Sequence, residues 1–200
     1  MFEIENELFG KYRYICGVDE AGRGPLAGPV CAAAVVLKEG AFIDGIKDSK
    51  KLSEKKREEL YDKIINEAVA YSICLVDEKR IDEINILNAT HEAMNNAVNS
   101  LSIKPEFVLI DGNSIKGMNL PHECIVKGDD KCNSIGAASI LAKVTRDRYM
   151  LKMHEKYPEY AFDKHKGYPT KLHYEMIEKH GILPIHRRSY LKKILNNGEL

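Results

Sequence analysis

The feature that most constrains the fold is a glycine-rich corner that follows a short apolar run near the N-terminus. Residues 18–25 read Val-Asp-Glu-Ala-Gly-Arg-Gly-Pro and come soon after the apolar residues 14–16. Side chains inside a regular strand alternate between its two faces, so two adjacent carboxylates can reach one small site only where the strand ends. Gly22 and Gly24 indicate such an end, because glycine admits backbone angles that other residues refuse. The stretch therefore predicts a pair of acids at a strand end, followed by a tight turn.

Two other interpretations of this corner fit the sequence less well. A solvated acidic turn is the ordinary interpretation of an Asp-Glu pair, but apolar runs flank this corner on both sides. A dinucleotide-binding fingerprint requires a strand, a G-x-G-x-x-G turn and then a helix. Here Pro25 and the strand-like run 30–37 follow the glycines, which excludes the fingerprint.

Length and composition predict one compact domain. The chain has 200 residues, and its apolar fraction of 44% suffices for a full core. Lys+Arg 30 balances Asp+Glu 30, so any surface for nucleic acid must be local. The five cysteines form no C-x-x-C pair, which predicts a reducing, cytoplasmic location rather than disulfides or a zinc site. No secretory signal precedes the corner, and no apolar run is long enough to span a membrane.

The apolar runs predict strands that alternate with helices. We expect strands at 12–18, 30–37, 71–76 and 107–110 and another ending at 125–126, and helices at 53–70, 88–101, 135–157 and 171–180, with a loop at 162–169. Ser53 and Asn88 are the expected N-caps of the first two helices. Strand 30–37, rich in Ala and Val, is expected to be buried on both faces. This order predicts an α/β protein with a mixed sheet and helices on its faces.

Three of the predicted strands are followed by carboxylates, at Asp19-Glu20, at Asp111 and at Asp129-Asp130. Strand ends in α/β sheets are where ligand sites collect. Carboxylates that are brought together raise each other's pKa unless a cation neutralises them. Oxygen ligands without a His/Cys set favour Mg²⁺ or Mn²⁺, and two such ions roughly 4 Å apart can stabilise a phosphoryl displacement. The acids thus predict a metal-dependent phosphoryl-transfer enzyme.

Six motifs occur in a fixed order, at residues 17–30, 48–52, 109–113, 127–129, 134–147 and 165–168. Each alone is a weak match, but their joint presence is highly specific. On these motifs the chain closely resembles the ribonuclease HII family, the type 2 ribonucleases H of bacteria, from about Tyr14 to Ser189.

The resemblance implies a ribonuclease H-like fold with a central mixed five-stranded sheet flanked by helices. It implies a single catalytic domain over 1–200, in which residues from about 160 onward form a C-terminal helical part that binds substrate. The implied activity is endonucleolytic cleavage of RNA in RNA–DNA hybrids and at single ribonucleotides embedded in duplex DNA. Two-metal hydrolysis would leave 3′-hydroxyl and 5′-phosphate ends, with Mg²⁺ or Mn²⁺ as cofactor.

The resemblance also assigns roles to individual residues. The metal-binding and catalytic acids match Asp19, Glu20, Asp111 and Asp129, and the Lys-Gly-Asp motif selects Asp129 over Asp130. The loop that reads the ribonucleotide falls on Gly22, Arg23 and Gly24. The 2′-hydroxyl distinguishes RNA from DNA, and backbone groups of glycines can approach it closely.

Tyr168 matches the tyrosine that senses the RNA–DNA junction in the family. Its ring can pack on a sugar while its hydroxyl reaches the 2′-hydroxyl, although a tyrosine packed under a loop is an open alternative. Candidate phosphate contacts are Lys50, Lys51, Lys143, Arg146, Lys164 and Lys166. For each lysine a solvated surface position is the competing interpretation. The basic tail 187–193 either holds the duplex or is a frayed end.

Two rival functions remain open at this point. A non-catalytic hybrid-binding module would have lost one of the acids, whereas all four are present. A metal phosphatase for small molecules would not need the glycine-arginine-glycine corner or Tyr168. The expected partner is nucleic acid rather than a membrane, and the expected oligomeric state is a monomer.

Overall fold

The computed structural model describes residues 3–46 and 52–192. Within them a mixed sheet of five strands runs through the molecule in the order β3-β2-β1-β4-β5. Its strands are β1 (Ile15–Ala21), β2 (Val30–Val36), β3 (Ala70–Val76), β4 (Phe107–Asp111) and β5 (His122–Ile125). β1, β2 and β3 are paired antiparallel, whereas β1, β4 and β5 are paired parallel. The predicted mixed five-stranded sheet is confirmed.

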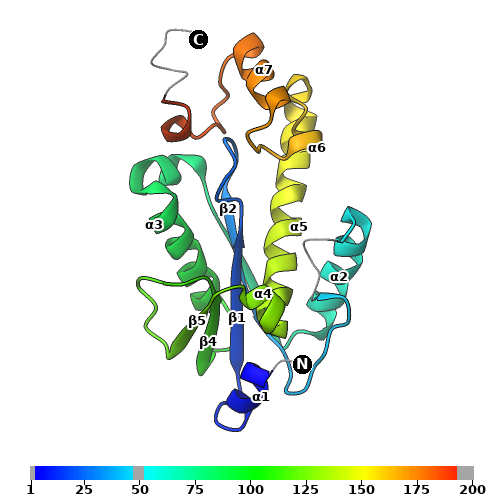
Figure 1. Ribbon diagram of the computed structural model, residues 1–200, viewed down its shortest axis with the longest axis vertical. Coiled ribbons are helices and arrows are strands. Elements are labelled where there is room, and N and C mark those ends of the chain that lie inside the picture. The colour runs from blue at the N-terminus through cyan, green and yellow to red at the C-terminus, as the bar shows by residue number, and fades with distance from the viewer. Residues whose placement is uncertain (1–2, 47–51, 193–200) are drawn as a thin grey trace.

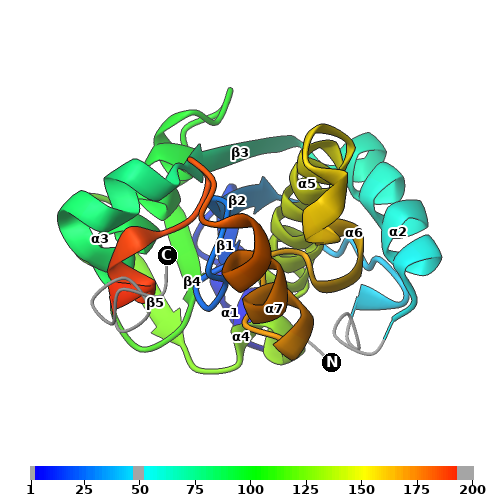
Figure 2. The same ribbon diagram turned by 90° about the horizontal axis from the view of Figure 1, so that it is seen from above.

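Helices cover both faces of this sheet, as Figure 2 shows from above. On one face α3 (Glu78–Asn99) packs against the side chains of Cys16, Ala32 and Ala34. On the other, α5 (Asn133–Lys156) and α2 (Glu54–Glu67) cover Cys31, Ala33 and Val35. Every residue of β2 is buried, because β2 has a strand on each side and helices above and below. The prediction that this strand is buried on both faces is therefore confirmed.

The start of α3 differs from the sequence-based prediction. The helix begins at Glu78, with Asp77 as its N-cap, and not at Asn88. Asn85 interrupts it with φ 65° and ψ 164°, and its side chain accepts the Asn88 N–H at 3.1 Å. The second half of α3 is thus capped from inside the helix. This side-chain cap, made by Asn85 and not by Asn88, explains why the local sequence resembles a helix start.

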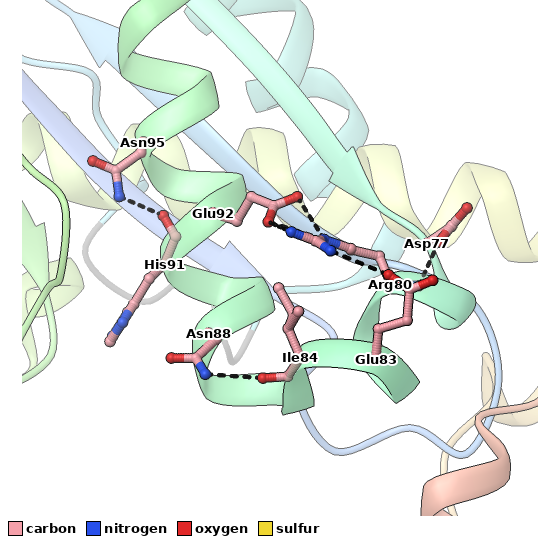
Figure 3. A network of polar contacts seen from close by, with 8 residues as sticks. All are labelled: Asp77, Arg80, Glu83, Ile84, Asn88, His91, Glu92 and Asn95. Carbon is pink, nitrogen blue, oxygen red and sulfur yellow. Dashed lines mark hydrogen bonds and ion pairs between the residues drawn. The ribbon is translucent and has the colours of Figure 1, made fainter.

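An ion-pair network spans the interruption in α3. Arg80, before it, donates to Glu83 at 3.1 Å and to Glu92, beyond it, at 2.9 Å (Figure 3). On the far side the Asn88 amide donates to the carbonyl of Ile84 at 2.9 Å. These contacts keep the two halves of α3 together over the same face of the sheet.

The N-terminal helix α1 (Glu3–Phe9) holds the start of α5. The carboxylate of Glu5 accepts the backbone N–H of Asn133 at 2.6 Å and that of Ser134 at 2.9 Å. A carboxylate at a helix N-terminus satisfies otherwise unpaired N–H groups and favours the helix dipole. α5 therefore begins two residues before the predicted start, and its cap comes from a distant part of the chain.

The chain that follows α5 forms several short helices near the top of Figure 1. They are the 3₁₀ turn η2 (Pro158–Tyr160), α6 (Phe162–His165), α7 (Lys171–His180) and the 3₁₀ turn η3 (Arg188–Tyr190). α6 occupies part of the predicted loop 162–169. Their apolar side chains form a cluster with Leu26 and Ala27, which follow β1. None of the described helices is long and apolar enough to cross a membrane.

Candidate active site

A cleft of about 350 Å³ opens beside β1, where this strand extends beyond its parallel neighbour β4. The register of the two strands stops at Val18 and Ile110, so Asp19 and Asp111 come next on neighbouring strands. The lining residues are Asp19, Glu20, Ala21, Gly22, Arg57, Asp111, Ser139, Ile140, Lys143 and Tyr168. The end of β4 thus creates the open edge at which the acids gather.

The acids lie inside β1 and not beyond its end, which corrects the sequence-based prediction. β1 continues to Ala21 because β2 remains paired with it, Asp19 opposite Ala33 and Glu20 opposite Ala32. Adjacent residues of a strand face opposite sides. Both acids nevertheless line the cleft, because β4 no longer covers this edge of β1.

Two carboxylates of the cleft have raised pKa values. Burial raises the pKa of Asp19 well above its usual range, and the charges of Glu20 and Asp111 raise it further. A hydrogen bond from Ser139 opposes this rise. Burial also raises the pKa of Glu20, against the lowering effect of Arg23, whose Nη1 lies 3.6 Å from Oε1 of Glu20. A bound cation would relieve this repulsion, and oxygen donors suit a hard divalent cation.

Each of these carboxylates also has a neighbour of its own. Oδ1 of Asp19 accepts the N–H of Glu20 at 2.7 Å, and Oδ1 of Asp111 accepts the N–H of Gly128 at 2.6 Å. In the described residues, no three acidic, histidine or cysteine side chains already converge closely enough to hold an ion. A cation would therefore have to draw the repelling carboxylates toward one another.

The structure does not place Asp129 among the lining residues of the cleft. It lies in the short helix α4 (Gly128–Lys131) and is 2% exposed. The preceding residue, Gly128, donates its N–H to Asp111. Asp129 is thus adjacent in sequence to a direct partner of Asp111. Asp130, which the motif comparison set aside, is exposed.

The glycine corner and Tyr168 lie beside the acids. Gly22 has φ +98°, and a Cβ at this position would collide with the side chain of Arg146. A Cβ built on Gly24 would lie 3.8 Å from Cε1 of Tyr168. The Tyr168 ring is 38% exposed and has the Lys143 ammonium 5.9 Å from its centroid. The ring is therefore open to solvent at the cleft and is not packed under a loop.

The candidate phosphate contacts fall into different positions. Lys143 lines the cleft and donates to Asp147 at 2.6 Å. Lys166 does not line it, and its ammonium donates to the carbonyl of Asp163 at 2.8 Å. Lys164 pairs with Asp163 on the surface. Lys50 and Lys51 lie outside the described residues.

Two arginines contradict the sequence-based interpretation. Arg146 and Arg187 are both 0% exposed, so neither is available to a phosphate in this conformation. Arg187 is also not part of a frayed end, because its guanidinium donates to Gly22, Arg23 and Gly28. Long-range carbonyl acceptors of this kind leave no mark in the local sequence.

Sequence reasoning missed two cleft residues, Ser139 and Arg57. Ser139 lies in the motif at residues 134–147 without an assigned role, yet it hydrogen-bonds Asp19. Arg57 comes from α2, and its guanidinium donates to the carbonyl of Leu52. The position of Ser139 on α5, near the strand that carries the acids, could have indicated the first. No sequence signal indicates the second.

Comparison with known proteins agrees with this architecture. The family model described as Ribonuclease HII matches residues 16–193. Ribonuclease HII of Caldicellulosiruptor bescii is 57% identical over 196 residues, covering 98% of this chain and 95% of that protein. Ribonuclease HII of Clostridioides difficile is 57% identical over 193 residues, covering 96% of this chain and 76% of that protein.

Solved structures show the same relationship. The crystal structure of the ribonuclease H2 from Pyrococcus horikoshii OT3 matches with a TM-score of 0.76 and 34% identity, over 88% of this chain and 93% of that chain. The chain therefore belongs to the ribonuclease HII family, whose members are metal-dependent endoribonucleases that cleave RNA in RNA–DNA hybrids.

Proposed function

We propose that this enzyme cleaves RNA–DNA hybrids and also duplex DNA that contains a single ribonucleotide, leaving 3′-hydroxyl and 5′-phosphate ends. The observation that carries this proposal is the content of one cleft. It combines the carboxylates of Asp19, Glu20 and Asp111 with Gly22 and Tyr168. The acids would hold the metal ions, and Gly22 and Tyr168 would recognise the sugar.

Asp19, Glu20, Asp111 and Asp129 would hold Mg²⁺ or Mn²⁺. Carboxylates with raised pKa values and no zinc-type ligand fit such hard cations. When bound, two ions supply stabilisation of the attacking and leaving oxygens of the phosphodiester. Ser139 and the Gly128 N–H orient the carboxylates of Asp19 and Asp111 through hydrogen bonds.

The corner Gly22-Arg23-Gly24 and Tyr168 would recognise the ribonucleotide. Arg23 and Gly24 are exposed, so their backbone groups can approach the 2′-hydroxyl without a Cβ at Gly24. The open face of the Tyr168 ring can stack on the sugar of the next nucleotide, while its hydroxyl reaches the same 2′-hydroxyl. An all-DNA duplex would lack the group that both elements contact.

Lysines would hold the phosphates. Lys143 lines the cleft and is the first candidate, and Lys166 and Lys50 stay candidates on the basis of their motifs. The helical part from about residue 160 onward would bind the duplex beside Tyr168. We further propose that the enzyme acts as a monomer in the cytoplasm.

The test compares three substrates with wild-type enzyme: a duplex with one ribonucleotide, the all-DNA duplex, and p-nitrophenyl phosphate. We expect cleavage of the first alone, at the ribonucleotide, with added Mg²⁺ or Mn²⁺ and none in excess EDTA. Hydrolysis of the small ester instead would indicate a phosphatase. Binding of the first duplex without cleavage under any metal would indicate a non-catalytic module.

Substitution of Tyr168 separates recognition from chemistry. Tyr168→Phe keeps the stacking face and removes one hydrogen bond, worth roughly 0.5–1.5 kcal/mol, so we expect a loss of about 2- to 12-fold in cleavage rate. Tyr168→Ala should lose more in rate than its melting temperature explains. Equal rates for wild type and Tyr168→Ala would remove Tyr168 from the proposal and leave the acids.

A further inference from the structure

Two arginine side chains are completely buried behind the glycine corner, an unusual place for a permanent charge. Arg146 of α5 and Arg187 of the C-terminal segment are both 0% exposed. In the described part of the chain, their hydrogen bonds go to backbone carbonyls and not to carboxylates. A buried charge is tolerated only when its donors are paired. The carbonyl acceptors are therefore essential to the placement of both side chains.

Arg187 holds the corner itself. Its Nη2 donates to the carbonyl of Gly22 at 2.6 Å, and its Nη1 donates to the carbonyl of Arg23 at 2.9 Å. Its Nε and Nη2 also donate to the carbonyl of Gly28 at 2.9 and 2.8 Å. The hydroxyl of Tyr190 donates to the same Arg23 carbonyl at 2.8 Å. Only a guanidinium fork can span these consecutive peptides, because the lysine ammonium is a single point.

Backbone pairing between distant segments fixes the position of Arg187. The N–H of Gly28 donates to Ile185, and the N–H of Arg187 donates to Leu26, both at 2.8 Å. Figure 1 shows this C-terminal segment beside the end of the β1–β2 connection. The guanidinium thus approaches the corner from a rigid neighbour and not from a mobile tail.

The orientation of the corner follows from peptide geometry. In a trans peptide the carbonyl and the next N–H point in opposite directions, and the described residues contain no cis peptide bond. Because the carbonyls of Gly22 and Arg23 point at Arg187, the N–H groups of Arg23 and Gly24 point away from it. Both residues are exposed, and Gly24 adjoins Tyr168. These N–H groups are therefore on the side that a substrate can reach.

We propose that Arg187 is a positioning residue, which turns the two peptides of the corner so that their N–H groups meet the ribose. This inference rests on the proposed function, in which the corner reads the 2′-hydroxyl. Without the guanidinium, the carbonyl of Gly22 would lose this donor and that of Arg23 would keep only Tyr190, so the peptides could rotate. Arg187 would then control the preference for RNA over DNA without touching the substrate.

The alternative is that Arg187 only anchors the C-terminal helices. Fluorescence anisotropy in excess EDTA separates the two roles, because cleavage is absent and no metal is involved. The measured quantity is the preference, the ratio of the dissociation constants for the all-DNA duplex and for the same duplex with one ribonucleotide. Each variant is measured below its own melting transition.

In Arg187→Met we expect the preference to fall by roughly 5- to 150-fold, because two hydrogen bonds to the ribose are no longer aligned while the contact from Tyr168 remains. Arg187→Lys should not restore it, since an ammonium cannot hold both carbonyls. Tyr160→Phe is the matched control, because it removes a hydrogen bond to Gly181 within the same helical part and leaves the donors to the corner in place. It should lower the melting temperature and leave the preference unchanged.

If Arg187→Met does not fold, Tyr190→Phe gives the answer. This variant removes one of the two donors to the Arg23 carbonyl, so its preference should fall below that of Tyr160→Phe. A preference in folded Arg187→Met, or otherwise in Tyr190→Phe, equal to that of wild type would overturn the positioning role alone. A wild-type preference of one would overturn the reading role of the corner in the proposed function, and this inference with it.

Discussion

Two groups of like charges lie in this molecule, and the fold surrounds them differently. In the cleft, burial raises the pKa values of Asp19 and Glu20, and the charge of Asp111 raises both further. Behind the corner, the guanidinium groups of Arg146 and Arg187 donate to backbone carbonyls. The two arginines are 0% exposed, whereas the acids line an open cleft.

This difference distinguishes a ligand-binding cluster from a structural one. A buried group whose charge is already satisfied stabilises one conformation, as the arginines do for the segment 22–29. A cluster of carboxylates with raised pKa values costs free energy in the folded protein, and such a cost is expected where a cation or substrate is to be bound. Charge alone does not distinguish the two clusters, but their exposure to the cleft does.

The largest expected effect comes from removing an acid. Asp19→Asn should reduce cleavage of the single-ribonucleotide duplex by more than the roughly 10–100-fold that is typical for loss of an outer-shell partner of a metal. The same change should raise the melting temperature without metal, because it removes a charge that Glu20 and Asp111 oppose. Cleavage assays and melting curves in EDTA measure the two effects. A variant that is both inactive and less stable would show that Asp19 is a structural residue.

A substitution in the arginine pair should have the opposite signature. Arg146→Met keeps the length of the side chain but leaves the carbonyls of Ala27, Pro29 and Lys166 without their donor. At about 1–3 kcal/mol for each buried group, we expect a loss of at least about 3 kcal/mol, or roughly 6–12 °C in melting temperature. Arg80→Met, which removes exposed ion pairs of α3 (Figure 3), should lose far less. Equal losses of melting temperature in Arg146→Met and Arg80→Met would contradict the structural role of the buried Arg146.

The pH dependence of stability tests the repulsion between the acids of the cleft. The raised pKa values of Asp19 and Glu20 mean that the folded chain binds protons more tightly than the unfolded chain above about pH 4. Stability without metal therefore falls as the pH rises through this window. The difference in melting temperature between Asp19→Asn and wild type should be near zero below pH 4 and grow above it. A difference that is independent of pH would contradict the coupling between these acids.

Buried histidines of the C-terminal part make stability rise with pH, in the wild-type protein and in Asp19→Asn alike. Burial lowers the pKa of His173 to about 3 and of His186 to about 4, so both are neutral in the folded chain. The unfolded chain binds more protons below about pH 6.5, and stability falls as the pH falls. Subtracting the wild-type curve from that of Asp19→Asn removes this shared contribution.

The smallest effect concerns a single phosphate contact. Binding of the hybrid should weaken steeply with ionic strength, because phosphate contacts release counterions. Lys143→Ala should reduce the slope of log K against log salt by about 1. Lys63→Ala, on α2 and outside the cleft residues, should leave the slope unchanged. An unchanged slope in Lys143→Ala would mean that Lys143 pairs with Asp147 and does not contact a phosphate.

The sequence by itself determined the parts that depend on local pattern and motif. The apolar runs located the strands, and Ser53 is the N-cap of α2 as predicted. The acids, the glycine corner and Tyr168 were identified from the same residues that carry the family resemblance. The structure brings Asp19, Glu20, Asp111 and Tyr168 to one cleft. Their catalytic and reading roles, and that of Asp129, stay predictions.

The tertiary structure decided how each charge is used. Arg187 was ambiguous in the sequence, since its acceptors Gly22 and Gly28 are more than 150 residues away. Lys166 and Lys143 belong to similar basic motifs, yet only the second lines the cleft. A sequence records which side chains carry charge, but burial and hydrogen-bond partners arise when distant segments meet. Those two quantities decide whether a charge binds a ligand or holds the fold.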